Sequence, residues 1–500
     1  MSALAVDVGT SMIKTVVFDD TGTEVAVARQ ATEVRRPRPG WAEQDMTAVW
    51  EAVVDTVRQV LPTVPGPVRF LALTAQGDGC WLVDDRGEPT GPAVLWSDGR
   101  AAGIVERWRG TGVLERAFRH NGSLTFPGLP NAILTWLAEH DPDRLARSRA
   151  ALYCGGWVFL RCTGERAVDE SDASAPFLDL GTRRYAPELV EAFGMEWARP
   201  LLPEVRGDDR RAGTLTAAAA ARLGLPAGLP VVLAPYDVAA TAIGVGATSP
   251  GQACTILGTT LCTEVVRNGS AARPAGTEEP SGLTVALDSA GTVLRAFPTL
   301  AGTEVLGWAA RLLGLAGPRD LVELAGRSGP GAGGLVFLPY LSPAGERAPF
   351  LDGDARGTVW GLSLEHGPAD IARAVLEGLS YVIADCVAVA GVGAGELRVC
   401  GGGASSPLWC QLIADVTGLP VVRSADTEVG AKGAFLSGMV ATGAAPDLAT
   451  AAARHVRVRT AAEPAPEQAR RYAAGFADFR DLRAVARRGW ARWAGQGGKG

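Results

Sequence analysis

The sequence predicts an α/β fold that is divided into two domains facing one cleft. Five hundred residues are too many for a single hydrophobic core, so two large domains are the expected division. Strand-like runs alternate with helical patterns along the first half of the chain. A strand, a Gly-Thr turn and a second strand occur at residues 4–18 and again at residues 252–266. This repeat suggests two related domains, although a Gly-Thr turn between strands is common.

The composition excludes several other classes of protein. Apolar residues make up 47% of the chain and no run of 18 apolar residues occurs, so we expect no membrane segment. The net charge is −6 without a basic patch in the main body, which argues against nucleic acid as a partner. The eight cysteines and four histidines show no metal-ligand spacing. With no signal-peptide pattern, they predict reduced thiols in a cytoplasmic protein.

The N-terminal hairpin carries the parts of a phosphate site. An apolar strand ends at Asp7, a Gly-Thr-Ser turn follows at residues 9–11, and the second strand carries Lys14. A further turn leads into a third strand over residues 24–31. Backbone N–H groups, two hydroxyls, one ammonium and one carboxylate are what ATP phosphates and hydrated Mg²⁺ require. Lys14 is one of only three lysines. The alternative is an ordinary hairpin with a polar turn.

The remaining elements follow from periodicity, caps and turn residues. Apolar runs predict strands at residues 68–74, 80–84, 231–234, 252–257, 261–266 and 397–400. Helical spacing predicts helices at residues 132–139 and 371–390. Another helix begins at Pro407, with Ser406 as its N-cap and Gly418 as its C-terminal stop. The Arg- and Ala-rich tail, residues 465–500, is typical of a terminal helix with a frayed end.

Two positions combine a strand end with a helix start. Asp237 follows a buried strand and opens a helix of small residues, where a carboxylate is suited to acid–base chemistry. An N-cap role is the more ordinary explanation. The glycines at 401–403 lie between a strand and the helix that Ser406 caps, which lets the backbone lie against a nucleotide. A tight loop between strand and helix is the alternative there.

Polar residues after another strand suit a ligand with several hydroxyls. Gln76 and Asp78 lie in Ala-Gln-Gly-Asp-Gly, and Trp96, Asp98 and Arg100 lie in Leu-Trp-Ser-Asp-Gly-Arg. Amide, carboxylate, indole and guanidinium groups together fit a polyhydroxy ligand. Turn chemistry at the glycines and a structural Asp98–Arg100 ion pair are the alternatives.

In this order the motifs resemble the FGGY family of carbohydrate kinases, which includes glycerol kinase and xylulokinase, over about residues 3–445. The most specific match is residues 357–377, which read Gly-Thr-Val-Trp-Gly-Leu, seven residues, then Asp-Ile-Ala-Arg-Ala-Val-Leu-Glu. Residues 339–347, 39–45 and 171–174 resemble further family segments. Two family positions differ: a usual lysine is Ile133, and Lys-Asp-Tyr/Trp reads Gly-Gly-Trp at 155–157. Both differences fall in the sugar-facing domain and therefore concern the substrate.

The resemblance implies two actin-like (ribonuclease H-like) domains around a cleft for ATP, Mg²⁺ and a small sugar or polyol. The implied divisions are residues 1–246 (sugar and phosphate hairpin), 247–445 (nucleotide) and 446–500 (helical tail). Asp237 matches the catalytic base that accepts the proton of the attacking hydroxyl, and Asp7 matches the residue that holds Mg²⁺ through water. The implied nucleotide contacts are Thr10, Ser11, Lys14, Gly258, Thr259, Gly302, Gly402, Gly403 and Ser406. A homodimer remains open as the assembly.

The substrate class depends on the Gln-Gly-Asp run at residues 76–78. Xylulokinases carry Gln-Met-His there and glycerol kinases carry Gln-Arg-Glu, whereas Gln-Gly-Asp-Gly followed by Trp-Leu-Val-Asp most resembles the erythritol-kinase branch. Asp78 beside a position without a side chain suits a small linear polyol, with Gln76, Trp96 and Asp237 as further contacts. We therefore expect ATP-dependent phosphorylation of an erythritol-like polyol. A ketopentose kinase of the xylulokinase type and a non-catalytic actin-like or sugar-sensing ATPase are the alternatives.

Overall fold

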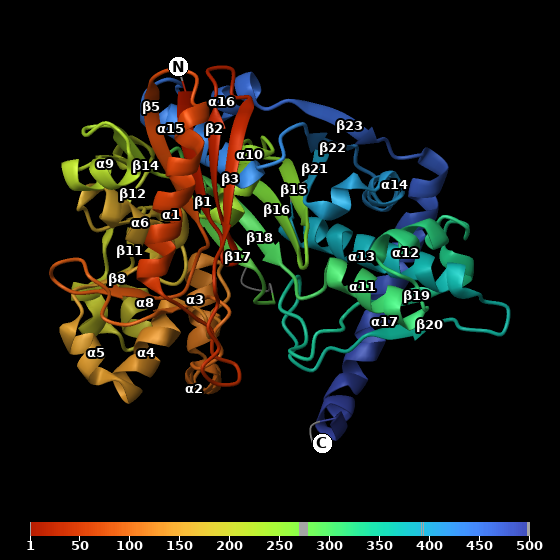
Figure 1. The fold of residues 1–500 in the computed structure, drawn as a ribbon. Coiled ribbons are helices and arrows are strands. Elements are labelled where there is room, and N and C mark those ends of the chain that lie inside the picture. The colour runs from red at the N-terminus through yellow and green to blue at the C-terminus, as the bar shows by residue number, and fades with distance from the viewer. Residues whose placement is uncertain (1, 270–278, 392, 394, 498–500) are drawn as a thin grey trace.

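The chain folds into two α/β domains that lie side by side (Figure 1). This structure is a computed structural model, and it describes residues 2–269, 279–391, 393 and 395–497. Both domains are built on a mixed sheet, so the prediction of two α/β domains is confirmed.

The N-terminal sheet has six strands in the order β13-β14-β5-β1-β2-β3. In chain order the strands are β1 (Ser2–Val8), β2 (Met12–Phe18), β3 (Glu24–Ala31), β5 (Val68–Ala75), β13 (Ala212–Thr214) and β14 (Pro230–Leu233). Strands β1, β2 and β3 pair antiparallel, and β5 and β14 continue the sheet parallel to β1. β1 is apolar on both faces, as expected for a strand at the centre of a covered sheet.

The C-terminal sheet repeats this arrangement. Its order is β17-β18-β16-β15-β21-β22-β23. The strands are β15 (Gln252–Leu257), β16 (Leu261–Asn268), β17 (Leu283–Ala286), β18 (Thr292–Pro298), β21 (Glu396–Cys400), β22 (Val421–Ser424) and β23 (Val458–Ala462). Strands β15, β16 and β18 pair antiparallel, and β21 and β22 follow parallel to β15. The β15–β16 hairpin therefore corresponds to the β1–β2 hairpin, which is the duplication that the sequence indicates.

Helices cover both sheets, and the N-terminal domain carries an additional lobe. One face of the N-terminal sheet packs against α1 (Met46–Val60), α6 (Cys154–Thr163) and α9 (Ala217–Leu223). A lobe inserted between β5 and β14 has its own core. It contains β6 (Trp81–Val83), β8 (Ala150–Leu152), α2 (Ala102–Gly110), α3 (Val113–Asn121), α4 (Pro130–His140), α5 (Pro142–Arg147) and α8 (Pro187–Ala192). The C-terminal core forms around α11 (Thr303–Leu312), α12 (Pro318–Ala325), α13 (Pro368–Ala390), α14 (Pro407–Thr417) and α17 (Pro466–Gly497).

Two crossing helices join the domains. α10 (Asp237–Gly244) follows the N-terminal sheet, and α15 (Val429–Ala441) comes from the second half of the chain but packs on β1 and β5. A side chain at Gly244 would place its Cβ 1.8 Å from the Val429 carbonyl oxygen, and one at Gly433 would lie 1.8 Å from the Ala240 carbonyl oxygen. The two backbones are therefore in direct contact, which only glycine permits.

Most of the predicted elements are present with small changes of boundary. β15 has the predicted bounds, whereas α13 begins three residues before the predicted helix because Asp370 accepts a hydrogen bond from the Gly367 N–H group at 2.9 Å. Ser406 caps α14 by accepting from the Trp409 N–H group at 3.2 Å, as predicted. The tail forms α17, and the predicted frayed end at residues 498–500 lies outside the described residues. Within the described chain, every helix is too short or too polar to cross a bilayer.

Candidate active site

A cavity of about 240 Å³ lies between the domains, and three of the predicted substrate contacts line it. The N-terminal domain contributes Thr10, Gly77, Asp78, Trp96, Leu124, Phe126, Tyr236, Asp237 and Val238. The C-terminal domain contributes Ile256, Thr260, Cys262, Gly282, Leu283, Pro298 and Arg347. Asp78, Trp96 and Asp237 come from distant parts of the sequence and meet here. The cavity has apolar walls with a few charged groups, as is typical of a small-molecule site.

Asp237 is one of the acids that line this cavity. It is the first residue of α10, whose N-cap is Tyr236, so the more ordinary role as an N-cap does not apply. Its carboxylate accepts a hydrogen bond from the Val238 N–H group at 2.8 Å. Burial, together with the nearby carboxylates of Asp7 and Asp78, raises the pKa of Asp237 to about 7. A carboxylate with a pKa near neutrality is suited to accept a proton from a substrate hydroxyl.

Asp78 faces a cation across the cavity. Its backbone has a φ of 55°, a left-handed conformation that non-glycine residues seldom adopt and that clusters at functional sites. Burial raises the pKa of Asp78 to about 7, and the positive charge of Arg347 partly opposes the rise. Burial in turn lowers the pKa of Arg347. The two side chains reach the cavity from opposite domains, so a ligand between them contacts both a carboxylate and a guanidinium.

The tail helix supports the loop that carries Arg347. The Arg347 Nε donates to the Pro298 carbonyl at 2.9 Å, and the buried Glu346 carboxylate accepts the Leu300 N–H at 2.7 Å. A few residues further on, the Phe350 ring stacks on the Trp490 indole of α17 with centroids 5.9 Å apart. Trp490 is fully buried. The last helix therefore fixes the wall of the cavity that faces Asp78.

Gln76, which the sequence predicts as a substrate contact, is turned away from the cavity. Its Oε1 accepts from the Thr10 hydroxyl at 2.7 Å, and its Nε2 donates to Gln44 at 2.8 Å. The Gln44 amide donates to the Thr10 carbonyl at 2.8 Å, and the Trp96 indole N–H donates to the Thr10 hydroxyl at 3.0 Å. Gln76 is therefore buried in a network that positions Thr10 and Trp96. Gln76 itself is not one of the described residues that line the cavity.

Asp98 and Arg100 form the structural ion pair that was the alternative to ligand binding. Arg100 Nε binds Asp98 at 2.8 Å, and its Nη2 binds Glu43 at 2.7 Å. The guanidinium also lies over the Trp41 ring at 3.9 Å. Trp41 and Glu43 of the Gly-Trp-x-Glu-Gln-Asp stretch therefore hold Arg100, and with it the chain after Trp96, in place.

The predicted phosphate side of the cleft holds charges from both domains. Lys14 Nζ binds the Glu428 carboxylate at 2.8 Å, and Arg29 binds the same carboxylate at 2.5 Å. Burial raises the pKa of Asp7 to about 6, and among the described residues no hydrogen-bond donor contacts its side chain. A Cβ at Gly430 would lie 3.1 Å from the Asp7 Oδ2, so this carboxylate lies against the backbone of α15. Ser11 is exposed in the adjacent turn.

The predicted nucleotide contacts of the C-terminal domain gather at the end of β15. Gly302 is the N-cap of α11, and its missing side chain makes room for the Thr259 carbonyl, 2.3 Å from where a Cβ would lie. The Thr303 N–H donates to the Gly258 carbonyl at 3.0 Å. These residues pack the second hairpin against a helix start.

The glycine loop after β21 has one position that packing does not explain. Gly401 has a φ of 85°, and a Cβ at Gly403 would lie 2.5 Å from the Trp409 ring. A Cβ at Gly402, by contrast, would meet no atom within 4 Å. Ser406 is occupied as the cap of α14. Gly402 therefore borders open space, as a residue beside a nucleotide would.

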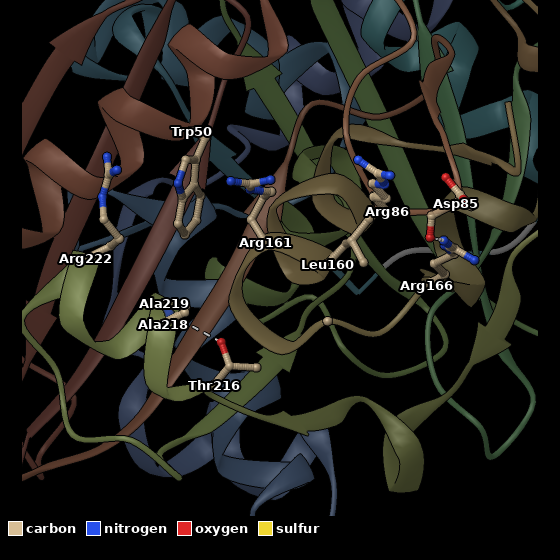
Figure 2. Close-up of a pocket in the computed structure, with 12 residues that line it drawn as sticks. Trp50, Asp85, Arg86, Leu160, Arg161, Arg166, Thr216, Ala218, Ala219 and Arg222 are labelled. Carbon is tan, nitrogen blue, oxygen red and sulfur yellow. Dashed lines mark hydrogen bonds between the residues drawn. The ribbon is translucent and has the colours of Figure 1, made fainter. Parts of the chain in front are cut away.

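A second cavity, of about 340 Å³, is lined by none of the predicted site residues (Figure 2). Four arginines surround it, at positions 86, 161, 166 and 222. Arg161 binds Glu88 at 2.8 Å, Arg222 binds Glu51, and Arg166 donates to the Asp84 carbonyl at 3.2 Å. Most of this charge therefore has partners within the protein.

The sequence did not single out several residues that form the site. Arg347 lies in a segment that matches the family, but no role was predicted for it. Tyr236 precedes Asp237 directly, yet nothing in the sequence indicates that its ring enters the cavity. Glu428 lies more than 400 residues from Lys14, so a local pattern does not reveal the pair. All eight cysteines are unpaired and buried, as predicted. The described residues contain no group of three metal-ligating side chains.

Comparison with known proteins identifies the relatives of this chain. Models of the FGGY family of carbohydrate kinases match residues 2–244 (N-terminal domain) and residues 253–442 (C-terminal domain). An erythritol kinase from Brucella abortus is 33% identical, covering 98% of this chain and 97% of its own length. A xylulose kinase from Escherichia coli is 32% identical over 85% of this chain and 87% of its own length.

Solved structures agree with this fold. A xylulose kinase from Lactobacillus acidophilus has a TM-score of 0.91 at 22% identity, covering 98% of this chain and 99% of its own. A xylulose kinase from Rhodospirillum rubrum has a TM-score of 0.88 at 28% identity, covering 97% and 99%. The expected family and its two-domain actin-like fold are confirmed.

Proposed function

The chain belongs to the FGGY family of carbohydrate kinases, and on that premise we propose that its substrate is a small linear polyol, erythritol or a close analogue. As a member of this family it is a phosphotransferase that uses ATP to phosphorylate a hydroxyl of a sugar or polyol. The observation that carries the choice of substrate is the small cavity between Asp78 and Arg347. Neighbouring hydroxyls of a polyol are able to donate to the carboxylate and accept from the guanidinium.

The comparisons support the same choice. The erythritol kinase aligns with nearly the whole chain, whereas the E. coli xylulose kinase aligns with 85% of it. A ketopentose is the second candidate, because the E. coli xylulose kinase is 32% identical to this chain.

In the proposed mechanism Asp237 orients the attacking hydroxyl and accepts its proton. The hydroxyl oxygen forms a bond to the γ-phosphorus of ATP as the bond to the β–γ bridging oxygen breaks, and ADP leaves. Thr10, Ser11 and Lys14 in one hairpin and Gly258 and Thr259 in the other contact the phosphates. The loop with Gly402 and Gly403 lies beside the adenosine, with Gly302 and Ser406 near it. Trp96 and Asp78 hold the substrate, and Gln76 supports them through Thr10. Catalysis then consists mainly of positioning and electrostatics.

Mg²⁺ fits the donor set on the phosphate side. Mg²⁺ in phosphoryl-transfer sites is usually held by one or two carboxylates together with phosphate oxygens and water. Asp7 supplies a half-buried carboxylate, and Lys14, which lies opposite it on the paired strand, is bound by Glu428. Asp7 would hold the ion through water, and the ion would offset the negative charge of the phosphates.

We also propose a cytoplasmic location for the protein. The unpaired cysteines support it, because thiols stay reduced in that compartment.

The test is ADP release from the purified protein with Mg-ATP and a panel of acceptors. The panel contains erythritol, threitol, ribitol, xylitol, arabinitol, glycerol, xylulose and ribulose, with a no-acceptor control. We expect strong turnover with a tetritol. A clear preference for xylulose would refute the polyol assignment but keep the mechanism, and ADP release that ignores every acceptor would refute both. Asp237→Asn should lower turnover by roughly 100-fold or more while ATP still binds.

A further inference from the structure

The Tyr236 ring occupies the space that a side chain at position 77 would fill. A Cβ at Gly77 would lie 2.2 Å from the Tyr236 Cδ2 and 2.7 Å from its Cε2. Real Cβ atoms do not approach ring carbons this closely, so the ring and any larger residue at 77 exclude each other. The missing side chain at Gly77 therefore does not leave open room for a substrate. It makes room for a ring that comes from residue 236.

Backbone conformation does not explain the glycine. Gly77 lies outside the left-handed region, whereas its neighbours Asp78 and Gly79 have φ values of 55° and 73°. An alanine could adopt the Gly77 backbone without strain. Contact with Tyr236 is then the reason that position 77 lacks a side chain.

The ring is held firmly between the two functional carboxylates. Tyr236 is 5% exposed and lines the same cavity as Asp78 and Asp237. Its backbone N–H donates to the Ser171 hydroxyl at 3.0 Å, and Ser171 in turn is bound to Asp169. The Gly77 N–H group donates to the Asp237 carboxylate, so the loop before Asp78 is tied to the catalytic helix as well. The Tyr236 ring therefore forms an aromatic wall of the cavity beside both the loop of Asp78 and the start of α10.

We propose that Tyr236 is a specificity-determining residue that sets the upper size limit of the substrate, with Gly77 as its obligatory counterpart. The proposal rests on the polyol kinase function stated above. A substrate with one more hydroxymethylene unit than a tetritol must push against this ring, and the ring has few rotamers available in a packed wall. Removing the ring opens the cavity beside both carboxylates without changing either one.

The test compares five proteins: wild type, Tyr236→Ala, Tyr236→Phe, Gly77→Ala and the double variant Gly77→Ala/Tyr236→Ala. Initial rates with Mg-ATP give kcat and KM for a tetritol, the pentitols and a hexitol. Tyr236→Ala should raise the pentitol-to-tetritol ratio of kcat/KM by roughly 10-fold or more. Tyr236→Phe keeps the ring and should keep the wild-type ratio, which makes it the matched control.

The double variant distinguishes a steric clash between residue 77 and the Tyr236 ring from a loss of activity with another cause. Gly77→Ala alone should raise the KM for the tetritol strongly, and adding Tyr236→Ala should restore much of the loss, because the clashing ring is gone. Thermal unfolding of every variant identifies any that fail to fold. A folded Tyr236→Ala protein with an unchanged size ratio would overturn the proposal, as would a Gly77→Ala protein with wild-type kinetics. If the wild type prefers a ketopentose, the polyol function fails, and the same variants tested with ketopentoses and ketohexoses still decide the role of Tyr236.

Discussion

Replacing Asp237 by asparagine should stabilise the protein at neutral pH while it removes the base. The pKa of Asp237 rises from 3.8 to about 7 on folding, mainly through burial. Each pKa unit is worth about 1.4 kcal/mol, so an ionised Asp237 costs about 4 kcal/mol of folding free energy. This figure is an upper limit, because the side chain keeps some contact with the cavity. Asparagine retains an oxygen that accepts the Val238 N–H, so the local backbone contact survives.

The effect has a defined sign and pH range. A carboxyl group with a raised pKa binds its proton more tightly in the folded state than in the unfolded state. Its contribution to stability is therefore present below about pH 4 and is lost as the pH rises from about 4 to about 7. Asp237→Asn does not titrate, so the advantage of the variant should be near zero at about pH 4 and full above about pH 7.

Thermal unfolding across this pH range measures the difference. An advantage of about 4 kcal/mol corresponds to about 4 °C if the chain unfolds as one unit, and to about 8 °C if the N-terminal domain unfolds alone. Asp55→Asn, the same substitution at an exposed acid on α1, is the matched control. If the melting temperatures of wild type and Asp237→Asn differed by the same amount at pH 4 and pH 8, the assignment of a base with a raised pKa would be refuted.

Three further outcomes are expected. Because Asp237 accepts a proton only when ionised, kcat/KM for the acceptor should rise as the pH passes through about 7, and a profile that is flat from about pH 5.5 to about 8 would contradict this. Lys14→Met should lower kcat/KM for ATP by roughly 10- to 100-fold and leave the acceptor KM nearly unchanged. The Glu428 carboxylate keeps Arg29 as a partner in this variant. Initial-rate kinetics measure both values, and an equal loss for the two substrates would contradict a phosphate contact by Lys14. Trp490→Ala should cost about 3–5 kcal/mol of stability and raise the acceptor KM, because the indole supports Phe350 in the loop that carries Arg347, and a variant that melts like the wild type would disprove that support.

Local sequence patterns were sufficient for most of the fold. The Gly-Thr turns at residues 9–10 and 258–259 fixed both hairpins, because apolar strands on each side leave no other place for a turn. The Ser406 cap and the Gly418 stop fixed α14 to the residue. The start of α13 was less predictable, since the side chain of Asp370 extends the helix before the apolar pattern begins.

Site residues could be predicted only where the sequence next to them shows their place at the end of a strand. Asp78 and Asp237 follow β5 and β14, which are parallel neighbours and so bring such ends to one edge. Trp96 follows a two-residue strand, Ala93–Val94, that pairs antiparallel with Glu43–Gln44 outside this sheet. Gln76 also ends a strand, but the alternation of side chains along it points its amide to Gln44 instead of the cavity. Arg347 and Tyr236 gain their meaning from contacts with distant residues. No periodicity within one segment encodes such contacts.

The backbone contact between α10 and α15 has a mechanical consequence. Glycines at 244 and 433 let the two helices touch without intervening side chains, so backbone atoms, which have no alternative rotamers, set the spacing of the helices. Asp237 begins one of these helices and Asp7 lies against Gly430 of the other. The contact therefore ties the position of one carboxylate to that of the other.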